Sequence, residues 1–180
     1  NAAAATAVAL AIGISPDIIK AAILTFSGLS HRQELIGSFQ NLIFVNDSKA
    51  TNADATARAL SCYDSIYWIA GGRAKQGGIE SLGEYFPNIK HAYLFGECAK
   101  EFAETLKGKV GYTICDTIHN VFDIILSHLY LAGHQYGVVL LSPAAASFDQ
   151  FSSYEVRGNI FRSLVNDKII YNSKLKLNLP

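Results

Sequence analysis

The sequence predicts an α/β protein, with a Rossmann-like, mostly parallel sheet, helices on both of its faces, and two helices in front of it. Three observations predict this fold. Half of the 180 residues are apolar and only 17% are charged, which suffices for a domain with a sizeable core. Short apolar runs alternate with helical stretches after residue 30, a pattern typical of βαβ units. Before residue 30 the pattern is helical only.

The first thirty residues predict two helices. We interpret the alanine-rich stretch Ala2–Ile12 as a buried helix. Ser15 is expected to cap a second helix that has Pro16 at its first position and ends near Phe26. We place a domain boundary at about residue 30. Because the chain contains no methionine, we expect a carboxyl-terminal fragment of a longer protein.

The rest of the chain alternates between strands and helices. The expected strands are 35–36, 42–45, 66–70, 91–95, 112–114 and 138–141. The expected helices are 53–60, 79–85, 98–106, 118–131 and 154–166. We assign residues 31–168 to one domain and residues 169–180 to a tail.

Composition excludes several classes of function. The net charge is zero, so no nucleic-acid surface is indicated. Three separated cysteines without a CxxC pair favour a reducing, cytoplasmic location, and five histidines without an HxxxH pattern are interpreted as structural or surface residues. The apolar opening lacks a positive leader and is too short to span a bilayer. We expect no metal site, no membrane and a monomer.

The most informative segment is Asn46–Asn52, with the sequence NDSKATN, which directly follows an apolar strand. Ligands bind beyond the carboxyl ends of strands in open α/β sheets. Thr51 or Asn52 can cap the next helix. Asp47 and Lys49 lie two positions apart, so both side chains can face a ligand or simply pair with each other.

Two more strand ends carry unusual residues. Gly71–Gly78 contains four glycines with Arg73 and Lys75, and is either an anion-binding loop or a mobile surface loop. A run of small residues leads into Ser147, which we place at the start of a helix, with Asp149 serving the same helix dipole. The simplest ligand for the three strand ends together is a small acid with one or two carboxylates.

These segments resemble the D-glutamate-adding Mur ligases. NDSKATN matches a motif of that family, and LSPAAASFDQF followed by YEVRGNIF resembles its LSPACASLDQF and FEQRGxxF segments. Ser30-His31-Arg32 resembles the family's entry to its last domain, and Asn1–Ala5 resembles a helix of its central domain. The resemblance covers residues 1 to about 168.

The resemblance implies an ATP-dependent ligase of peptidoglycan synthesis. ATP would phosphorylate the carboxylate of UDP-N-acetylmuramoyl-L-alanine, D-glutamate would attack the acyl phosphate, and Mg²⁺ would neutralise phosphate charge. Residues 1–30 would be the carboxyl-terminal helices of the central ATPase domain, and residues 31–168 the domain that binds D-glutamate.

Residue roles follow from the matched motifs. Asn1, Arg32 and Asp47 would face ATP, and Arg32 and Lys49 would be catalytic. The residues that would bind D-glutamate are Thr51, Lys75, Ser147, Phe148 (through its backbone) and Tyr154. Tyr154 and Phe148 stand where the family has phenylalanine and leucine, so Tyr154 adds a hydroxyl to the pocket.

The chain lacks a GxxxxGK[ST] phosphate loop, so we expect it to be inactive alone, with the metal ligands elsewhere in a longer protein. The alternative is a non-catalytic, Rossmann-like module that binds an amino acid or nucleotide. Half of an NAD-dependent dehydrogenase is disfavoured because GxGxxG is absent.

Overall fold

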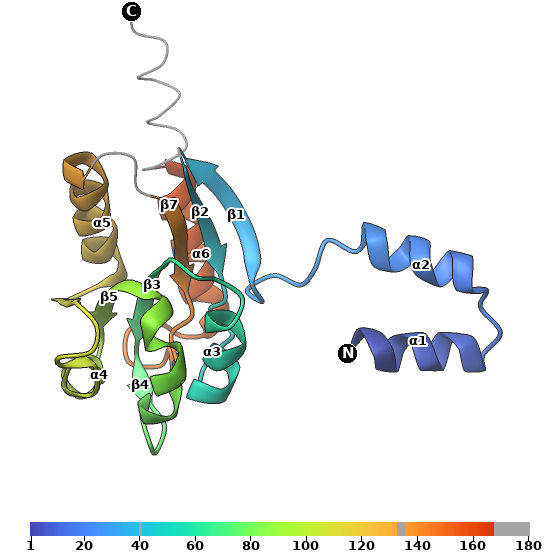
Figure 1. Cartoon of the computed structure of the whole chain (residues 1–180), viewed down its shortest axis with the longest axis horizontal. Helices are drawn as coiled ribbons and strands as arrows, with labels where there is room; N and C mark the ends of the chain where they lie inside the picture. Colours follow the sequence, from blue (N-terminus) through green and yellow to red (C-terminus); the bar gives the residue numbers. More distant parts are fainter. Residues whose placement is uncertain (40, 133–135, 168–180) are drawn as a thin grey trace, which may run out of the picture.

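A six-stranded sheet forms the centre of the protein in a computed structural model that describes residues 1–39, 41–132 and 136–167 (Figure 1). The strand order is β1-β2-β7-β3-β5-β6. The bounds are β1 Glu34–Phe39, β2 Asn41–Asn46, β3 Ile66–Gly71, β5 Ile89–Phe95, β6 Tyr112–Cys115 and β7 Tyr136–Leu141. Only β1 runs antiparallel to its neighbour, so the predicted mostly parallel α/β sheet is confirmed.

Helices cover both faces of the sheet. One core contains side chains of α3 (Ala53–Leu60), the 3₁₀ helix η1 (Glu80–Asn88) and α4 (Ala99–Leu106). The other contains side chains of α5 (Ile118–Ala132) and α6 (Tyr154–Leu164). The strand β3 contributes to both, because neighbouring strand residues point to opposite faces: Trp68 enters the first core and Ile69 the second.

The helix predicted at 79–85 forms as a 3₁₀ helix over Glu80–Asn88 instead of an α-helix. Gly83 and Pro87 lie inside it. Glycine has the highest entropic cost in a helix, and proline lacks the N–H that an α-helical turn needs. A nine-residue 3₁₀ helix, about three turns long, therefore replaces the predicted α-helix.

The first two helices lie apart from the sheet and bury little (Figure 1). They are α1 (Ala2–Ala11) and α2 (Pro16–Thr25), and a single connecting segment joins them to β1 (Figure 1). No residue of α1 is buried and only Ile19 of α2 is. The prediction that the alanine-rich helix is buried is wrong, because its small side chains face only α2 and solvent. Ser15 is the residue before α2, but its side chain makes no capping hydrogen bond.

Within the described residues, no helix is long and apolar enough to cross a membrane. The three cysteines are free thiols, with Cys98 and Cys115 buried. The tail predicted at 169–180 lies outside the described residues, as does the last residue of the domain predicted over 31–168.

The position of β7 determines where the polar strand ends meet. It pairs with β2 on one side and β3 on the other, and both pairs are parallel. The segments that follow β2, β3 and β7 therefore leave the same edge of the sheet. Two of them pair again, because β4 (Arg73–Ala74) and β8 (Ala145–Ala146) form a short antiparallel ladder. Neither short strand was predicted.

Candidate functional site

Asp47 lies where β2 ends, and its carboxylate is buried. Its backbone N–H donates to Leu141 O at 2.7 Å, which continues the pairing with β7. The side chain accepts hydrogen bonds from Ser142 Oγ at 2.9 Å and from Gln33 N at 3.2 Å. Burial raises the pKa of Asp47 to about 6, although the Ser142 hydroxyl and Gln33 N–H act in the opposite direction. An acid that titrates near neutral pH at a strand end is a candidate functional group.

A pocket of about 420 Å³ opens beside Asp47. Its lining residues are Arg32, Gln33, Asp47, Lys49, Ala50, Asn52, Asp54, Ala55 and Arg58. The pocket thus brings together three predicted site residues, Arg32, Asp47 and Lys49. Lys49 Nζ also lies 5.0 Å from the ring centre of Tyr154, which is a cation–π contact. The walls carry both charge signs, positive from Arg32, Lys49 and Arg58 and negative from Asp47 and Asp54.

Two other residues of the NDSKATN segment, Ser48 and Asn52, have structural roles. Asn52 caps α3 by accepting a hydrogen bond from Ala55 N at 2.8 Å, which confirms the capping prediction for Asn52. Ser48 is fully buried, and its hydroxyl donates to Tyr154 O at 2.8 Å. Thr51 is half-buried at the start of the same loop as Asn52.

The glycine-rich segment after β3 is held tightly. Gly71 and Gly72 have φ angles of 140° and 131°, and a Cβ atom on Gly71 would collide with Phe95 O. Arg73 is committed to Glu97 through two hydrogen bonds of 2.9 Å, so its charge is already neutralised. Lys75 is exposed on this loop and stays a predicted anion-binding residue.

Ser147 does not start a helix, contrary to the prediction. It begins a turn that Phe151 N closes by donating to Ser147 O at 2.9 Å. The helix α6 starts later, at Tyr154, where Ser153 Oγ accepts from Val156 N. Ser153 therefore provides the cap in place of Ser147, and the sequence alone does not distinguish the two serines.

The side chains in this turn differ in exposure. Ser147 is only 2% exposed, whereas Phe148 is 65% exposed. Asp149 does not serve the dipole of α6, because its Oδ2 accepts from Glu97 N at 3.1 Å. The prediction for Asp149 is therefore wrong, since the turn directs its carboxylate toward the end of β5.

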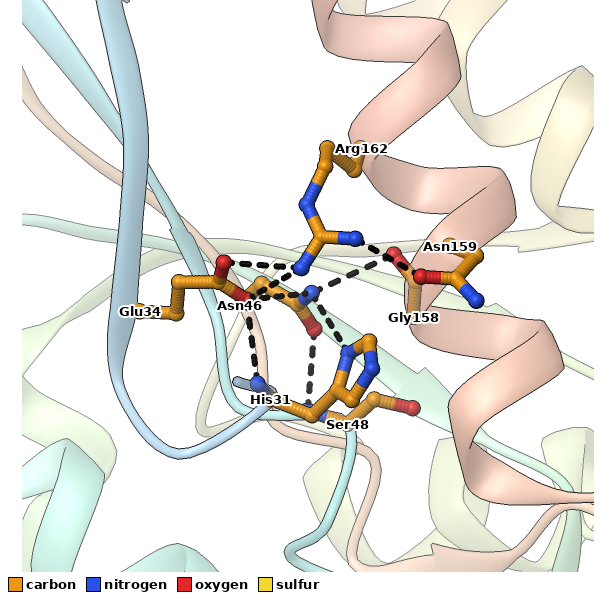
Figure 2. A network of polar contacts seen from close by, with 7 residues as sticks. All are labelled: His31, Glu34, Asn46, Ser48, Gly158, Asn159 and Arg162. Carbon is orange, nitrogen blue, oxygen red and sulfur yellow. Dashed lines mark hydrogen bonds and ion pairs between the residues drawn. The ribbon is translucent and has the colours of Figure 1, made fainter. Parts of the chain in front are cut away.

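A second polar network ties the segment before β1 to the body (Figure 2). Asn46 Nδ2 donates to His31 Nδ1 at 3.0 Å, and Asn46 Oδ1 accepts from Ser48 N at 3.2 Å. Glu34 accepts from His31 N at 3.0 Å and from Arg162 Nη2 at 2.7 and 2.8 Å. His31, which follows the expected domain boundary, is thereby held to β2 through Asn46 and to α6 through Glu34 and Arg162.

This network also sets the charges around Arg32. Burial lowers the pKa of His31, and the positive charge of Arg162 lowers it further. Partial burial acts to raise the pKa of Glu34, but the His31 N–H and the Arg162 guanidinium bring it below its usual value. Glu34 is therefore ionised and paired with Arg162 at pH 7, whereas His31 is neutral.

Asn1 lies apart from Asp47 in a different cavity. It lines an apolar groove of about 630 Å³ along α1 and α2, to which Arg32 also contributes. Of the predicted ATP-facing residues, Arg32 alone lines both this groove and the pocket that contains Asp47.

The sequence predicts no role for Arg157, Ser142 or Asn46, although all three lie in segments that resemble the Mur ligases, and it predicts only a structural or surface role for His31. Arg157 is fully buried and bonds to three separate loops. The signal that could have found it is a cation one position before Gly158, on a helix that packs into the core. A Cβ at Gly158 would collide with His31 Nδ1, so only glycine fits there.

Searches against known proteins give close relatives. The chain is 54% identical over 165 residues to a protein of Nitrobacter winogradskyi named UDP-N-acetylmuramoylalanine–D-glutamate ligase. Proteins of the same name from Rhodopseudomonas palustris and Paramagnetospirillum magneticum are 54% and 51% identical, again over 92% of this chain. The chain is a homologue of the D-glutamate-adding Mur ligases. No family model matches it.

The Mur ligase homology covers most of this chain but only part of its relatives. The chain spans about a third of their length, 35–36% in these three cases. The resemblance stated from the motifs is thus confirmed by similarity along the chain. The relatives are named as ligases of UDP-N-acetylmuramoylalanine and D-glutamate, so a non-catalytic binding module is not favoured.

Proposed function

We propose that this chain is the carboxyl-terminal part of an ATP-dependent ligase that joins D-glutamate to UDP-N-acetylmuramoyl-L-alanine through an acyl phosphate. The observation that carries the proposal is the 54% identity to ligases of that name over 165 residues, which is 92% of this chain. In this division, residues 1–30 end the central ATPase domain and residues 31–168 form the D-glutamate-binding domain.

The pocket beside Asp47 supports a nucleotide-facing role for its residues. Arg32 would stabilise phosphate charge with its guanidinium, and Asp47 would accept hydrogen bonds from ribose hydroxyls. Lys49 would lie between the nucleotide and the amino acid, because it lines the pocket and also contacts Tyr154. Asn1 would approach the nucleotide from the helix pair.

The loops at the same sheet edge support an acidic amino-acid site. Thr51 and Ser147 would donate hydroxyl hydrogen bonds to the carboxylates of D-glutamate, and Lys75 would supply a positive charge. The backbone of Phe148 and the ring of Tyr154 would complete the pocket. Thr51 and Ser147 follow the neighbouring parallel strands β2 and β7, which is the placement that such a pocket needs.

Magnesium would be held elsewhere in the longer protein. Among the described residues, no group of three His, Cys, Asp or Glu side chains lies close enough to hold a metal ion. For the same reason, and because the phosphate loop is missing, we propose that the 180-residue chain does not catalyse ligation alone. Robust ATP turnover by this chain with both substrates present would contradict that statement.

A stereochemical binding test addresses the substrate. D- and L-glutamate are titrated separately into ¹⁵N-labelled protein in the presence of ADP, and amide shifts are followed. We expect D-glutamate to shift the amides of Lys49, Thr51 and Ser147, and L-glutamate to bind more weakly.

Ser147→Ala should reduce D-glutamate binding by about tenfold, as expected for one hydrogen bond to a charged group. Ser163→Ala, an exposed serine on α6, is the matched control. Equal binding of both enantiomers would refute the proposal.

A further inference from the structure

Arg157 joins three separate loops through a single side chain. Its Nε donates to Ser48 Oγ at 3.0 Å and its Nη2 to Ser48 O at 2.9 Å. Its Nη1 donates to Gly71 O at 3.3 Å and to Ala145 O at 3.1 Å. The rigid guanidinium plane therefore fixes the relative positions of the loop after β2, the last residue of β3 and the short strand β8, which follows β7.

The loops that Arg157 joins are the ones that carry the proposed D-glutamate residues. Lys49 and Thr51 come directly after Ser48, and Lys75 comes four residues after Gly71. Ser147 comes two residues after Ala145, and α6 itself starts with Tyr154. The proposed binding residues on these loops therefore lie one to four positions from a residue that Arg157 contacts. A shift of the guanidinium would move the loops that carry them.

Other contacts also hold these segments. A Cβ on Gly72 would collide with Ala146 O, so the segment after β3 already lies against the segment after β7. The segment after β2 is joined to the segment after β7 by two hydrogen bonds of Asp47, one from its N–H to Leu141 O and one from Ser142 Oγ to its carboxylate. Arg157 adds the connection between Ser48 and Gly71, so the position of the segment after β2 relative to β3 depends on this side chain.

A buried cation is an expensive way to join loops. Arg157 is 0% exposed, and its hydrogen bonds in the described part of the chain all end on uncharged oxygens. Burial lowers the pKa of Arg157 to about 10, so it is charged at pH 7. Asp149 is a nearby carboxylate that acts to raise this pKa, but its own hydrogen bond goes to Glu97 N. Apolar residues can hold buried segments together at lower cost, but they would not supply the positive potential that the Arg157 guanidinium adds.

We propose that Arg157 is the positioning residue of the acidic amino-acid pocket, setting the spacing of the loops that bind the substrate and adding positive potential beneath it. It does not touch the substrate, because it is fully buried below the loops. The inference rests on the proposed function for the identity of the ligand, but not for the statement that Arg157 sets the loop geometry.

The geometric statement is tested without any ligand. Amide hydrogen exchange is compared among the wild-type chain, Arg157→Lys and Arg157→Met. Lysine keeps the charge but loses the planar fork. We expect exchange at residues 48–51, 71–75 and 145–148 to accelerate by about tenfold or more in both variants, relative to β5 amides of the same sample. Dividing the loop exchange rates by those of the β5 amides corrects for any general loss of stability in the variant.

Arg162→Lys is the matched control, because Arg162 lies on the same helix but contacts Glu34 and Asn159 instead of the loops. It should leave exchange in the three loops at the wild-type rate. Unchanged loop exchange in Arg157→Lys, or equal acceleration at all β5 amides, would overturn the inference. If Arg157→Met does not fold, Arg157→Lys alone decides the result.

The substrate statement is tested by titrating D-glutamate into the same variants. We expect affinity to fall by about tenfold in Arg157→Lys, through lost positioning, and further in Arg157→Met, which also loses the charge. Wild-type affinity in Arg157→Lys would overturn the link between loop spacing and binding, and equal losses in both variants would overturn the contribution of the charge. If the wild-type chain binds no D-glutamate, the proposed function fails, while the loop exchange still decides whether Arg157 sets the geometry.

Discussion

The sheet with its flanking helices buries its large apolar side chains, whereas the α1–α2 pair leaves most of them exposed to solvent. In the sheet region, Trp68, Phe44 and Phe122 are completely buried. In the helix pair, Val8, Ile23 and Phe26 are 50–65% exposed. Both regions are rich in apolar residues, so composition does not separate them. The difference is that strands of the sheet are covered on two faces, whereas each helix of the pair has only the other beside it.

The comparison separates helix formation from burial. α1 and α2 form where the sequence predicts helices, with Pro16 at the first position of α2. Their exposed apolar surface nevertheless exceeds what isolated surface residues explain. Local sequence determines the helix, and a second packed layer determines whether the helix contributes to a core.

The largest contrast is expected between two aromatic residues. Trp68→Ala removes a fully buried ring in β3 and its hydrogen bond to Ser142 O at 2.8 Å. The free energy of unfolding should fall by about 3–5 kcal/mol. Phe26→Ala, at the exposed end of α2, should change it by less than about 0.5 kcal/mol. Urea unfolding followed by far-ultraviolet circular dichroism, a backbone signal, measures the free energy of unfolding of both variants. Similar losses would show that the helix pair is part of the same cooperative unit.

A second contrast concerns pH. The pKa of Asp47 is about 6 in the folded chain and 3.8 when unperturbed, so the folded state binds more protons between these values. The free energy of unfolding should therefore fall by about 2 kcal/mol as pH rises from about 4 to about 6, through this group. Asp47→Asn should remove that part of the slope.

Asp17→Asn provides the comparison for this test, because Asp17 is exposed on α2. It should retain the slope of the wild-type chain. A wild-type slope in Asp47→Asn would mean that another group is responsible.

The smallest contrast is between two residues that precede helices. Asn52 accepts a hydrogen bond from Ala55 N, so Asn52→Ala should cost about 1 kcal/mol in the free energy of unfolding. Ser15 makes no such bond, and Ser15→Ala should have no measurable effect. Thermal unfolding of the two variants side by side is sufficient, and an equal cost would argue that Ser15 caps α2 in solution.

Periodicity identified the elements because most of them are bounded by strong local signals. Residues 53–60 and 66–70 agree with α3 and β3 almost to the residue. The errors occur where two local signals compete or where contacts are distant. Ser147 and Ser153 are both plausible caps in sequence, and only the path of the turn selects Ser153. The β4–β8 ladder joins residues 73 and 146, and no local pattern announces it.

The candidate site divides in the same way. Asp47 and Lys49 could be identified because a charged pair after an apolar strand is unusual. Arg157 could not be given a role, because its partners Ser48, Gly71 and Ala145 are up to 109 residues away and are backbone or hydroxyl oxygens. A buried arginine bound to carbonyl groups has no partner of opposite charge for sequence reasoning to find.

The central place of β7 has a consequence for how this chain emerges from a ribosome. Every other strand of the six-stranded sheet precedes it in sequence, yet β2 and β3 are joined only through it. A nascent chain that has not yet reached residue 136 carries two unconnected half-sheets, each with an open edge that can pair with the wrong segment. Because this closure depends on long-range pairing, it should be slow, and premature termination upstream of β7 should yield aggregation instead of a smaller folded product.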